Sequence, residues 1–349
     1  MTNEQIIKDA IKTSTLSHGL LNAEQAKKFL QQTFDSPTLL KQVRHVLRTS
    51  KTGEIDKIGI ARRILRGKTE DTDDGYRASV NTNVIDYSTT AVRAPWEITE
   101  ETLRENIEGQ NLEKVITDLM TKQIGLDEED LCLNSNTAAG TATNFSASAS
   151  YNAGDIVVND GHLYQFTAAH ATAAWSGTDV LEIGAASDTD FLKLNDGWIK
   201  QIAANGHVFD ASTLNSGAMS LDIFYKALAT IPNKYNNGNL RWIMSPHRAQ
   251  EWELFLLNKV VGAGGAVPEN LYTAPVRIPT IECSNISDDK ILLVDPKNLI
   301  EVNSYNVQVR KTTEGKEAIM QDKRFYVVHF DFDPIIEETD ATCIITGLA

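Results

Sequence analysis

The stretch PWEITEETLRENIEGQNLEKVITDLMTKQIG, residues 95–125, constrains the fold most, because its pattern predicts one long helix. Thr99 is the expected N-cap and Gly125 the expected end, while Gly109 would permit a bend. About 25 residues at about 1.5 Å each make a rod of about 40 Å, across which other elements should pack. One apolar stripe follows from steps of three and four residues: Leu103, Ile107, Leu112, Val115, Ile116, Leu119, Met120 and Ile124.

Length and composition indicate a globular protein without a membrane span or a disulfide framework. The 349 residues, 42% of them hydrophobic, are enough for one large domain with an insertion or for two domains. No apolar run approaches 18 residues and MTNEQ is not a signal peptide, so we expect neither secretion nor a membrane span. Three distant cysteines, Cys132, Cys283 and Cys343, without a CxxC pair, predict a reducing compartment and no disulfide framework.

The net charge of −14 argues against a general nucleic-acid binder, which would carry a basic face. It does not argue against proximity to DNA. A wall that holds DNA without adhering to it would carry this sign of charge.

The first hundred residues contain elements that are too slight to fold alone. Residues 1–50 are predicted to be short helices, including 22–34 and a helix opened by Ser36-Pro37, which dock on the same chain or equally on a partner subunit. From Glu54 onward, apolar residues recur at every second position, as they do in β-strands. Residues 54–95 are therefore predicted to form a long hairpin with a polar tip. A two-stranded hairpin is marginal in water, so this one should lie against another surface.

The remainder mixes helices with antiparallel strands. Residues 126–134 are expected to end in a strand, residues 135–150 to be a Ser/Thr/Ala-rich linker, and residues 188–206 to be one helix. Further helices are expected at 221–231 and 246–257, and strands over most of the last 80 or so residues. This order is α+β rather than alternating βαβ.

No catalytic constellation emerges from the residues. His329, Asp331 and Asp333 alternate on one strand face and could hold a divalent cation, but we favour a solvated face. The glycines Gly262, Gly264 and Gly265 lack the spacing of a dinucleotide loop and are expected to form a plain loop. We therefore expect no catalytic residue, no metal and no cofactor.

The order of elements resembles a tailed-bacteriophage major capsid protein of the Hong Kong 97-like fold. The phrases WEITEETLRENIEG, GLDEEDLCLNS, DTDFLKLNDGW and LLVDPKNLI are individually loose but jointly specific in order and spacing. The resemblance implies an α+β capsid fold with the following parts: N-terminal arm 1–53, extended loop 54–95, peripheral domain 96–140 and 301–349 with a spine helix at 99–125, an inserted β module with linkers at 141–187, and axial domain 188–300.

The same resemblance implies a structural function. The chain would assemble with itself into hexamers and pentamers of an icosahedral shell that encloses double-stranded DNA without sequence-specific binding. It would be a virion capsid protein, made and assembled in the host bacterial cytoplasm without a membrane. Because the sequence lacks the long N-terminal scaffolding segment of the family's type member, either a separate scaffold protein or assembly without one is implied, with portal and decoration proteins as further partners.

Charged residues on the hairpin and the spine helix are candidate contacts between subunits. The resemblance places Arg62, Arg63 and Arg66 on the extended loop, near an adjacent helix that carries Glu100, Glu101 and Glu105. The alternative is plain solvated charge, since exposed ion pairs contribute little to stability.

Residues 151–183 form an extra piece with its own signals. Asn159-Asp160-Gly161 predicts a hairpin turn, and the Tyr, Gly-Asp and Trp spacing is similar to small chitin-binding-type modules. Tyr151, Tyr164 and Trp175 would either stack on the rings of a surface glycan or form the module's own core. We favour the core, because so small a module without cysteine needs its aromatics for packing. The module is expected on the outside of the shell, on flexible flanks.

Two other functions stay open. An encapsulin-type bacterial compartment shares the fold, and DNA inside purified particles would separate it from a virus. A carbohydrate-binding or carbohydrate-active protein is suggested by the insert, but the chain lacks a signal peptide and a credible acid/base pair of carboxylates.

Overall fold

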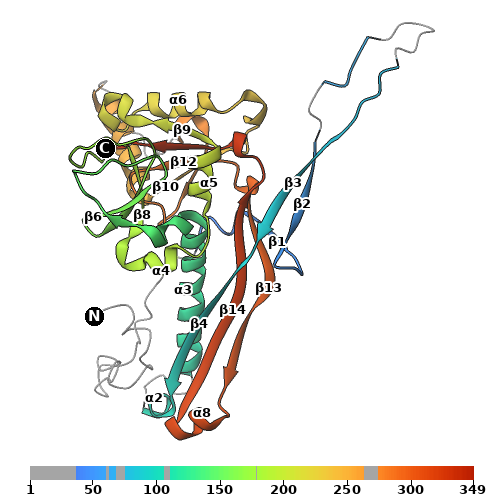
Figure 1. Ribbon diagram of the computed structural model, residues 1–349, viewed down its shortest axis with the longest axis vertical. Coiled ribbons are helices and arrows are strands. Elements are labelled where there is room, and N and C mark those ends of the chain that lie inside the picture. Colours follow the sequence, from blue (N-terminus) through green and yellow to red (C-terminus); the bar gives the residue numbers. More distant parts are fainter. Residues whose placement is uncertain (1–36, 60–62, 68–74, 106–110, 178, 263–273) are drawn as a thin grey trace.

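The computed structural model describes residues 37–59, 63–67, 75–105, 111–177, 179–262 and 274–349. Helices and sheets are mixed, as expected for an α+β chain. Figure 1 shows a lobe built around a long sheet and one long helix, a second lobe of shorter strands and helices, and a hairpin that projects from the junction. No helix of the described residues is long and apolar enough to cross a membrane.

A four-stranded sheet forms the long lobe. Its strand order is β1 (Arg44–Leu47), β13 (Leu299–Thr312), β14 (Lys323–Ile336) and β4 (Thr90–Thr99). The β13–β14 and β14–β4 pairs are antiparallel, whereas β1 and β13 are parallel. Helix α3 (Leu112–Asn134) lies along one face of this sheet, and β4 is an edge strand.

The region predicted to be one long helix contains two described helices with different boundaries. Helix α2 spans Glu100–Glu105, and the Thr99 hydroxyl accepts the Thr102 backbone N–H at 3.3 Å, which confirms the N-cap. Residues 106–110, with Gly109, lie outside the described residues. Helix α3 continues past Gly125, so both the predicted end and the strand at 126–134 are wrong. Burial of its last turn, including Leu131 and Leu133, outweighs the cost of about 1 kcal/mol for a helical glycine.

The helix predicted from Pro37 is also wrong. Residues 37–43 form turns, and residues 44–47 form β1 at the edge of the long sheet. The Leu39 and Leu40 backbone N–H groups donate to the Glu129 carboxylate at 2.8 and 3.2 Å, while both side chains are buried against α3. Tertiary contacts therefore replace the local helix signal. The helices expected over residues 1–36 lie outside the described residues.

The second lobe contains a five-stranded sheet. Its strand order is β11 (Thr280–Glu282), β10 (Arg241–Met244), β12 (Ile291–Val294), β15 (Cys343–Thr346) and β9 (His207–Asp210). Helices α6 (Leu221–Thr230) and α7 (Pro246–Gly262) pack on one face through a core that includes Phe224, Trp242 and Trp252. The loop expected at Gly264 and Gly265 lies outside the described residues, and Gly262 is the last residue of α7.

The core is continuous from one lobe to the other. Helix α5 (Trp198–Asn205) packs on the inner face of the five-stranded sheet through Trp198 and Ile202, in the same apolar cluster as Phe332 of the long sheet. The chain ends in the five-stranded sheet, because β15 pairs with β12 and β9. Residues 343–346 therefore do not return to the peripheral sheet, contrary to our expectation for 301–349.

Two further predictions of secondary structure are wrong. The helix predicted over 188–206 is broken into α4 (Thr189–Leu192) and α5, because the Asn195 amide donates to the Phe332 carbonyl at 3.3 Å and Gly197 lies against the Leu133 carbonyl with no space for a Cβ. The connection between β13 and β14 contains helix α8 (Lys316–Gln321) where a strand was expected.

The inserted segment forms a four-stranded sheet: β5 (Thr143–Asn144), β6 (Ile156–Asn159), β7 (His162–Phe166) and β8 (Val180–Ala185). Its hairpin turn is confirmed, with positive φ angles of 48° at Asp160 and 81° at Gly161, as a type I′ turn requires. The preceding linker is not free along its whole length: Ser135 and Asn136 are buried, and residues 137–141 form a short 3₁₀ helix.

The projecting hairpin consists of β2 (Thr52–Gly59) and β3 (Asn81–Ser88) in antiparallel register. Figure 1 shows it leaving the body near the upper end of the long sheet. The predicted boundary at residue 95 is wrong, because β4 separates from the hairpin at Thr90 and pairs with β14 instead.

Candidate assembly surfaces

The hairpin is attached to the body by one face of its root. Tyr87 of β3 is buried in an apolar cluster with Ile300, Val302 and Ile335 of the long sheet, and Ile55 and Ile85 pack at its margin. At Gly53 a Cβ would lie 2.7 Å from the Tyr87 hydroxyl oxygen, so a glycine is needed where the two strands pass. Alternation along the strands directs this face to the body.

Polar groups complete the root. The Lys57 ammonium donates to the Glu337 carbonyl at 3.1 Å and forms an ion pair with Glu338. The Ser88 backbone N–H donates to the Asp333 carboxylate at 2.7 Å, and Lys51 lies 3.3 Å from the Asp331 carboxylate. The hairpin is therefore held at its base by apolar contacts with β13 and β14, and by polar contacts with β14 and the two residues that follow it.

These contacts explain the acidic residues that could have suggested a metal. Asp331 accepts from the Ser304 hydroxyl at 2.9 Å, Asp333 accepts from the Asn195 amide at 3.2 Å, and His329 is exposed. The described residues contain no group of three or more His, Cys, Asp or Glu side chains that could hold a metal ion. Asp331 and Asp333 are buried and bind the hairpin root, so the solvated face that we favoured is wrong for these two residues.

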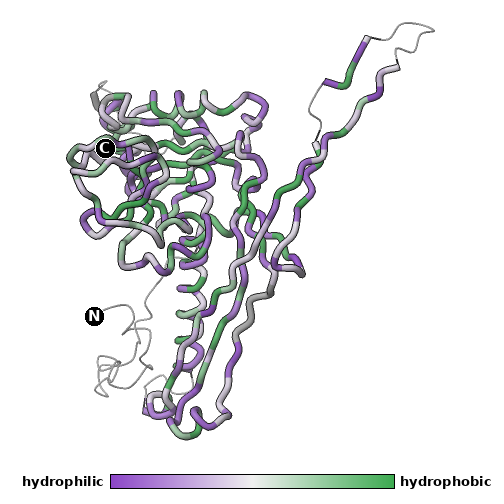
Figure 2. The backbone as a smooth tube through the Cα atoms, in the orientation of Figure 1, coloured by the Kyte–Doolittle hydropathy of each residue, from purple (hydrophilic) through white to green (hydrophobic). Residues whose placement is uncertain are grey.

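Beyond the root the hairpin exposes apolar side chains. Ile58 is 71% exposed and Leu65 is 91% exposed, and Val80 and Val84 are also solvent-accessible. Figure 2 shows hydrophobic residues recurring along the projecting strands, well away from the body. Ile58 and Val84 share one face by strand register, opposite the face that packs on the body. Apolar side chains held this far out indicate contact with another molecule.

The arginines and glutamates predicted to form contacts between subunits lie in different parts of the chain. Arg62 lies outside the described residues, Arg63 is exposed, and the Arg66 guanidinium carbon lies 3.8 Å from the centre of the Tyr76 ring. Glu101 and Glu105 are exposed near the opposite end of the long sheet. Among the described residues, Arg63 and Arg66 therefore lie at the opposite end of the molecule from these glutamates.

Glu100 already has a partner in its own chain. Arg324 of β14 donates to both Glu100 carboxylate oxygens, one at 3.0 Å, and also pairs with Glu113 of α3. The hydrogen bond from Arg324 holds the pKa of Glu100 below its usual range. Sequence reasoning missed this cluster, because Arg324 lies more than two hundred positions from the two glutamates.

A buried acid cluster joins the long helix to the first strand of the sheet. Glu301 of β13 is almost fully buried, His45 of β1 lies 3.0 Å from its carboxylate, and Glu128 of α3 hydrogen-bonds to it. Burial, together with the neighbouring Glu301 charge, raises the pKa of Glu128 to about 9. Burial opposes ionisation of Glu301 as well, but hydrogen bonds from His45 and Glu128 outweigh it and lower the pKa of Glu301. The cluster therefore holds one shared proton between two carboxyl groups at neutral pH.

The three aromatics predicted on the insert do lie together. The Tyr164 and Trp175 rings meet edge to face with centroids 4.8 Å apart, and Tyr151 stacks on Phe166 at 5.0 Å. Phe145 contacts both Tyr151 and Trp175. Each of the three predicted residues is half-buried, so their rings pack mainly on one another and on the sheet.

The insert also packs on the main body. Leu181 of β8 belongs to the central core, and Ile156, Leu163 and Ile183 pack against Leu192 of α4. Lys290 is completely buried and donates to the Glu182 carbonyl, and the Glu182 backbone N–H donates to the Asp289 carboxylate at 2.9 Å. The last strand of the insert is thus part of the body's packing.

The long sheet with its helix, the five-stranded sheet and the projecting hairpin together define a Hong Kong 97-like capsid fold. Among sequence relatives, the chain is 25% identical over 360 residues to the putative prophage capsid protein YqbE of Bacillus subtilis strain 168, covering 98% of this chain and 97% of that protein. No protein-family model matches the chain.

Solved capsid and compartment shells share this fold. A chain of the satellite phage P4 procapsid, which includes the size determination protein, matches with a TM-score of 0.53 and 15% identity, over 97% of this chain and 99% of that chain. A chain of Gordonia phage Cozz matches with a TM-score of 0.56 and 11% identity, over 98% and 95%. The SrpI encapsulin of Synechococcus elongatus PCC 7942 matches with a TM-score of 0.52 and 11% identity, over 97% and 96%.

Proposed function

We propose that the chain is the major capsid protein of a tailed bacteriophage or prophage, copies of which assemble into an icosahedral head around double-stranded DNA. The observation that carries the proposal is a capsid fold over almost the whole chain, together with a relative named as a prophage capsid protein that aligns end to end. A shell subunit needs surfaces that only neighbours can cover, and the projecting hairpin supplies one.

Several finer features belong to the same proposal. The subunits would form hexamers and pentamers, helped by a separate scaffold and joined to portal and decoration proteins. The excess of acidic residues favours a lining that confines DNA without adhering to it. Assembly would take place in the host bacterial cytoplasm, and the role would be purely structural, without catalysis, cofactor or membrane.

Expression of the full chain in bacteria, alone and with candidate scaffold proteins from the same prophage, tests the proposal. Sedimentation and negative-stain microscopy should show closed icosahedral particles. A stable compact monomer at high concentration, with the hairpin protected from protease, would contradict it.

An encapsulin-type compartment is the second candidate, favoured by the match to the SrpI shell. The discriminating measurement is the content of particles released from the native host after nuclease treatment. Protected double-stranded DNA of uniform length supports the virus, whereas a protein cargo without DNA supports the compartment.

For the insert, the self-packed aromatics favour a structural role over glycan recognition. Trp175 remains partly exposed, so a surface glycan on the outside of the shell is retained as the proposed ligand of this patch. Binding of purified particles to chitin and bacterial cell-wall fragments, compared with a Trp175→Ala variant whose insert stays folded, tests it.

A further inference from the structure

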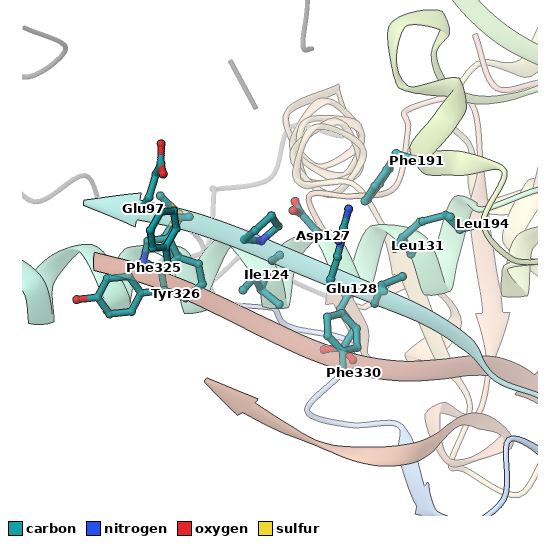
Figure 3. A pocket seen from close by; sticks show the side chains of 16 residues that line it. Glu97, Ile124, Asp127, Glu128, Leu131, Phe191, Leu194, Phe325, Tyr326 and Phe330 are labelled. Carbon is teal, nitrogen blue, oxygen red and sulfur yellow. The ribbon is translucent and has the colours of Figure 1, made fainter. Parts of the chain in front are cut away.

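An open apolar groove of about 830 Å³ lies between helix α3 and the edge of the long sheet. Figure 3 shows Glu97, Phe325 and Tyr326 toward one end and Phe191 and Leu194 toward the other. One wall is the face of α3 that carries Met120, Ile124 and Leu131. The opposite wall is β4, which has no strand on its outer edge among the described residues.

The sequence explains why the groove is open. Val92 and Ala94 of β4 line the groove with short side chains, which leave the space between the strand and α3 unfilled. Phe191 and Leu194 of the α4 region are only partly buried at the groove's end. An exposed apolar surface of this extent indicates that another segment or molecule covers it.

A buried polar group in the groove also lacks a partner. The Trp96 side chain lines the groove and is 8% exposed, and its ring stacks on Tyr326 with centroids 5.4 Å apart. Its indole Nε1 is buried, and no described residue lies within hydrogen-bonding distance of it as an acceptor. Buried indole N–H groups usually have an acceptor, so the missing occupant should supply one.

We propose that residues 23–34 of the same chain form an amphipathic helix that docks in this groove. The chain enters the described structure beside it: the Pro37 ring lies against Gly125 of α3, and the Leu39 N–H donates to Glu129. Phe34 is only three residues earlier, within about 10 Å of that point along the chain. The groove thus begins where the segment must end.

The segment matches the groove in length and in pattern. Twelve helical residues span about 18 Å, and the six β4 residues from Val92 to Glu97 span about 20 Å. Ala26, Leu30 and Phe34 recur at four-residue steps, which places them on one helix face. The last turn of such a helix has free carbonyl groups that can accept the Trp96 N–H.

Charge is complementary as well. Glu97 and Asp127 lie on the groove lining, and the segment carries Lys27 beside its apolar face, with Lys28 on the opposite face. The whole stretch of residues 1–36 has four lysines and four acidic residues, so it adds no net charge to an acidic chain. Docking within one chain differs from the subunit contacts of the proposed function and does not depend on them.

Cross-linking tests the placement. The three native cysteines are fully buried and should not react with a bis-maleimide, so the Ile124→Cys and Leu30→Cys double variant can be used directly. We expect a bridge within one chain, mapped by mass spectrometry after digestion. The matched control pairs Leu30→Cys with Leu65→Cys on the projecting hairpin and should not bridge within one chain. A bridge only between chains, or no bridge, would overturn the proposal.

Hydrogen exchange of backbone amides provides a second test, in which no groove residue is substituted. Phe34→Asp should release the segment and speed exchange of the backbone amides of α3 residues 120–131 by about tenfold or more, with Lys28→Asp as the matched control. Unchanged exchange in the groove after Phe34→Asp would contradict the docking, whether or not the chain forms shells.

Discussion

The projecting hairpin and the inserted sheet are both small antiparallel β elements, but they treat their apolar side chains in opposite ways. The hairpin buries only its root and exposes Ile58 and Leu65. The insert packs its aromatics on one another and its last strand on the body. The difference indicates that the hairpin is an incomplete element that needs a neighbour, whereas the insert is complete within one chain.

The largest expected effect comes from charging the exposed hairpin face. Ile58→Asp with Val84→Asp should abolish or strongly reduce particle formation and leave the melting temperature of the unassembled chain within about 2 °C of wild type. Both side chains are exposed, so the isolated fold loses little. Size-exclusion chromatography and negative-stain microscopy measure assembly.

The matched control for the hairpin is Asn81→Asp with Thr82→Asp. It adds the same charge to β3 of the hairpin, with Thr82 directly opposite Ile58, and removes no apolar side chain. Assembly that survives the first double variant would show that the hairpin face is not an interface, and the comparison with the insert would fail.

The second prediction tests whether the insert is part of the body. Leu181→Ala removes a side chain that is buried in the central core, and should destabilise the whole chain by about 2–4 kcal/mol. Urea unfolding monitored by tryptophan fluorescence measures this loss, with the exposed Thr172→Ala as the control. A global stability equal to that of wild type would show that the insert is an independent appendage.

Trp175→Ala should have a smaller and more local effect. Trp175 contacts Phe145 and Tyr164 but is partly exposed, so its loss should cost about 1–2 kcal/mol in the local opening of the inserted sheet. Hydrogen exchange should rise over residues 143–185 and stay unchanged in the five-stranded sheet. Unchanged exchange in the insert would favour a recognition role for Trp175.

The smallest effect concerns the pH dependence of stability, at the acid cluster between α3, β1 and β13. Glu128 keeps its proton in the folded chain up to a pKa of about 9, whereas the unfolded chain releases it near pH 4.5. The folded state therefore binds more protons between these values, and stability should fall as pH rises through this window. The raised pKa of His45 acts in the same direction above its unfolded value of 6.5.

Glu128→Gln should remove most of that slope. The neutral amide keeps a hydrogen bond to Glu301 without a proton to lose, so at pH 8.5 the variant should melt about 2–4 °C above wild type. Differential scanning calorimetry between pH 6 and 9 provides the measurement, with the exposed Glu101→Gln as the control. A variant with an unchanged slope would place the proton elsewhere.

Local features of the sequence determined several elements directly. The Asp160-Gly161 turn was predictable because few residue pairs adopt positive φ at both positions. The Thr99 cap and the end of α6 before Pro232 follow from hydrogen-bonding rules within a few residues. The period of apolar residues predicted the helical character of α2 and of the first half of α3, and the ordered phrases along the chain predicted the capsid fold.

Only the tertiary structure decided which partners those elements would meet. Helix α3 passes Gly125, residues 44–47 form a strand, and β15 crosses to the five-stranded sheet because burial and sheet pairing outweigh local preferences. The pairing of Arg324 with Glu100 and the use of Asp331 and Asp333 at the hairpin root join residues that are remote in sequence. A single sequence carries no local signal for such contacts, since their free energy arises only once the chain has folded.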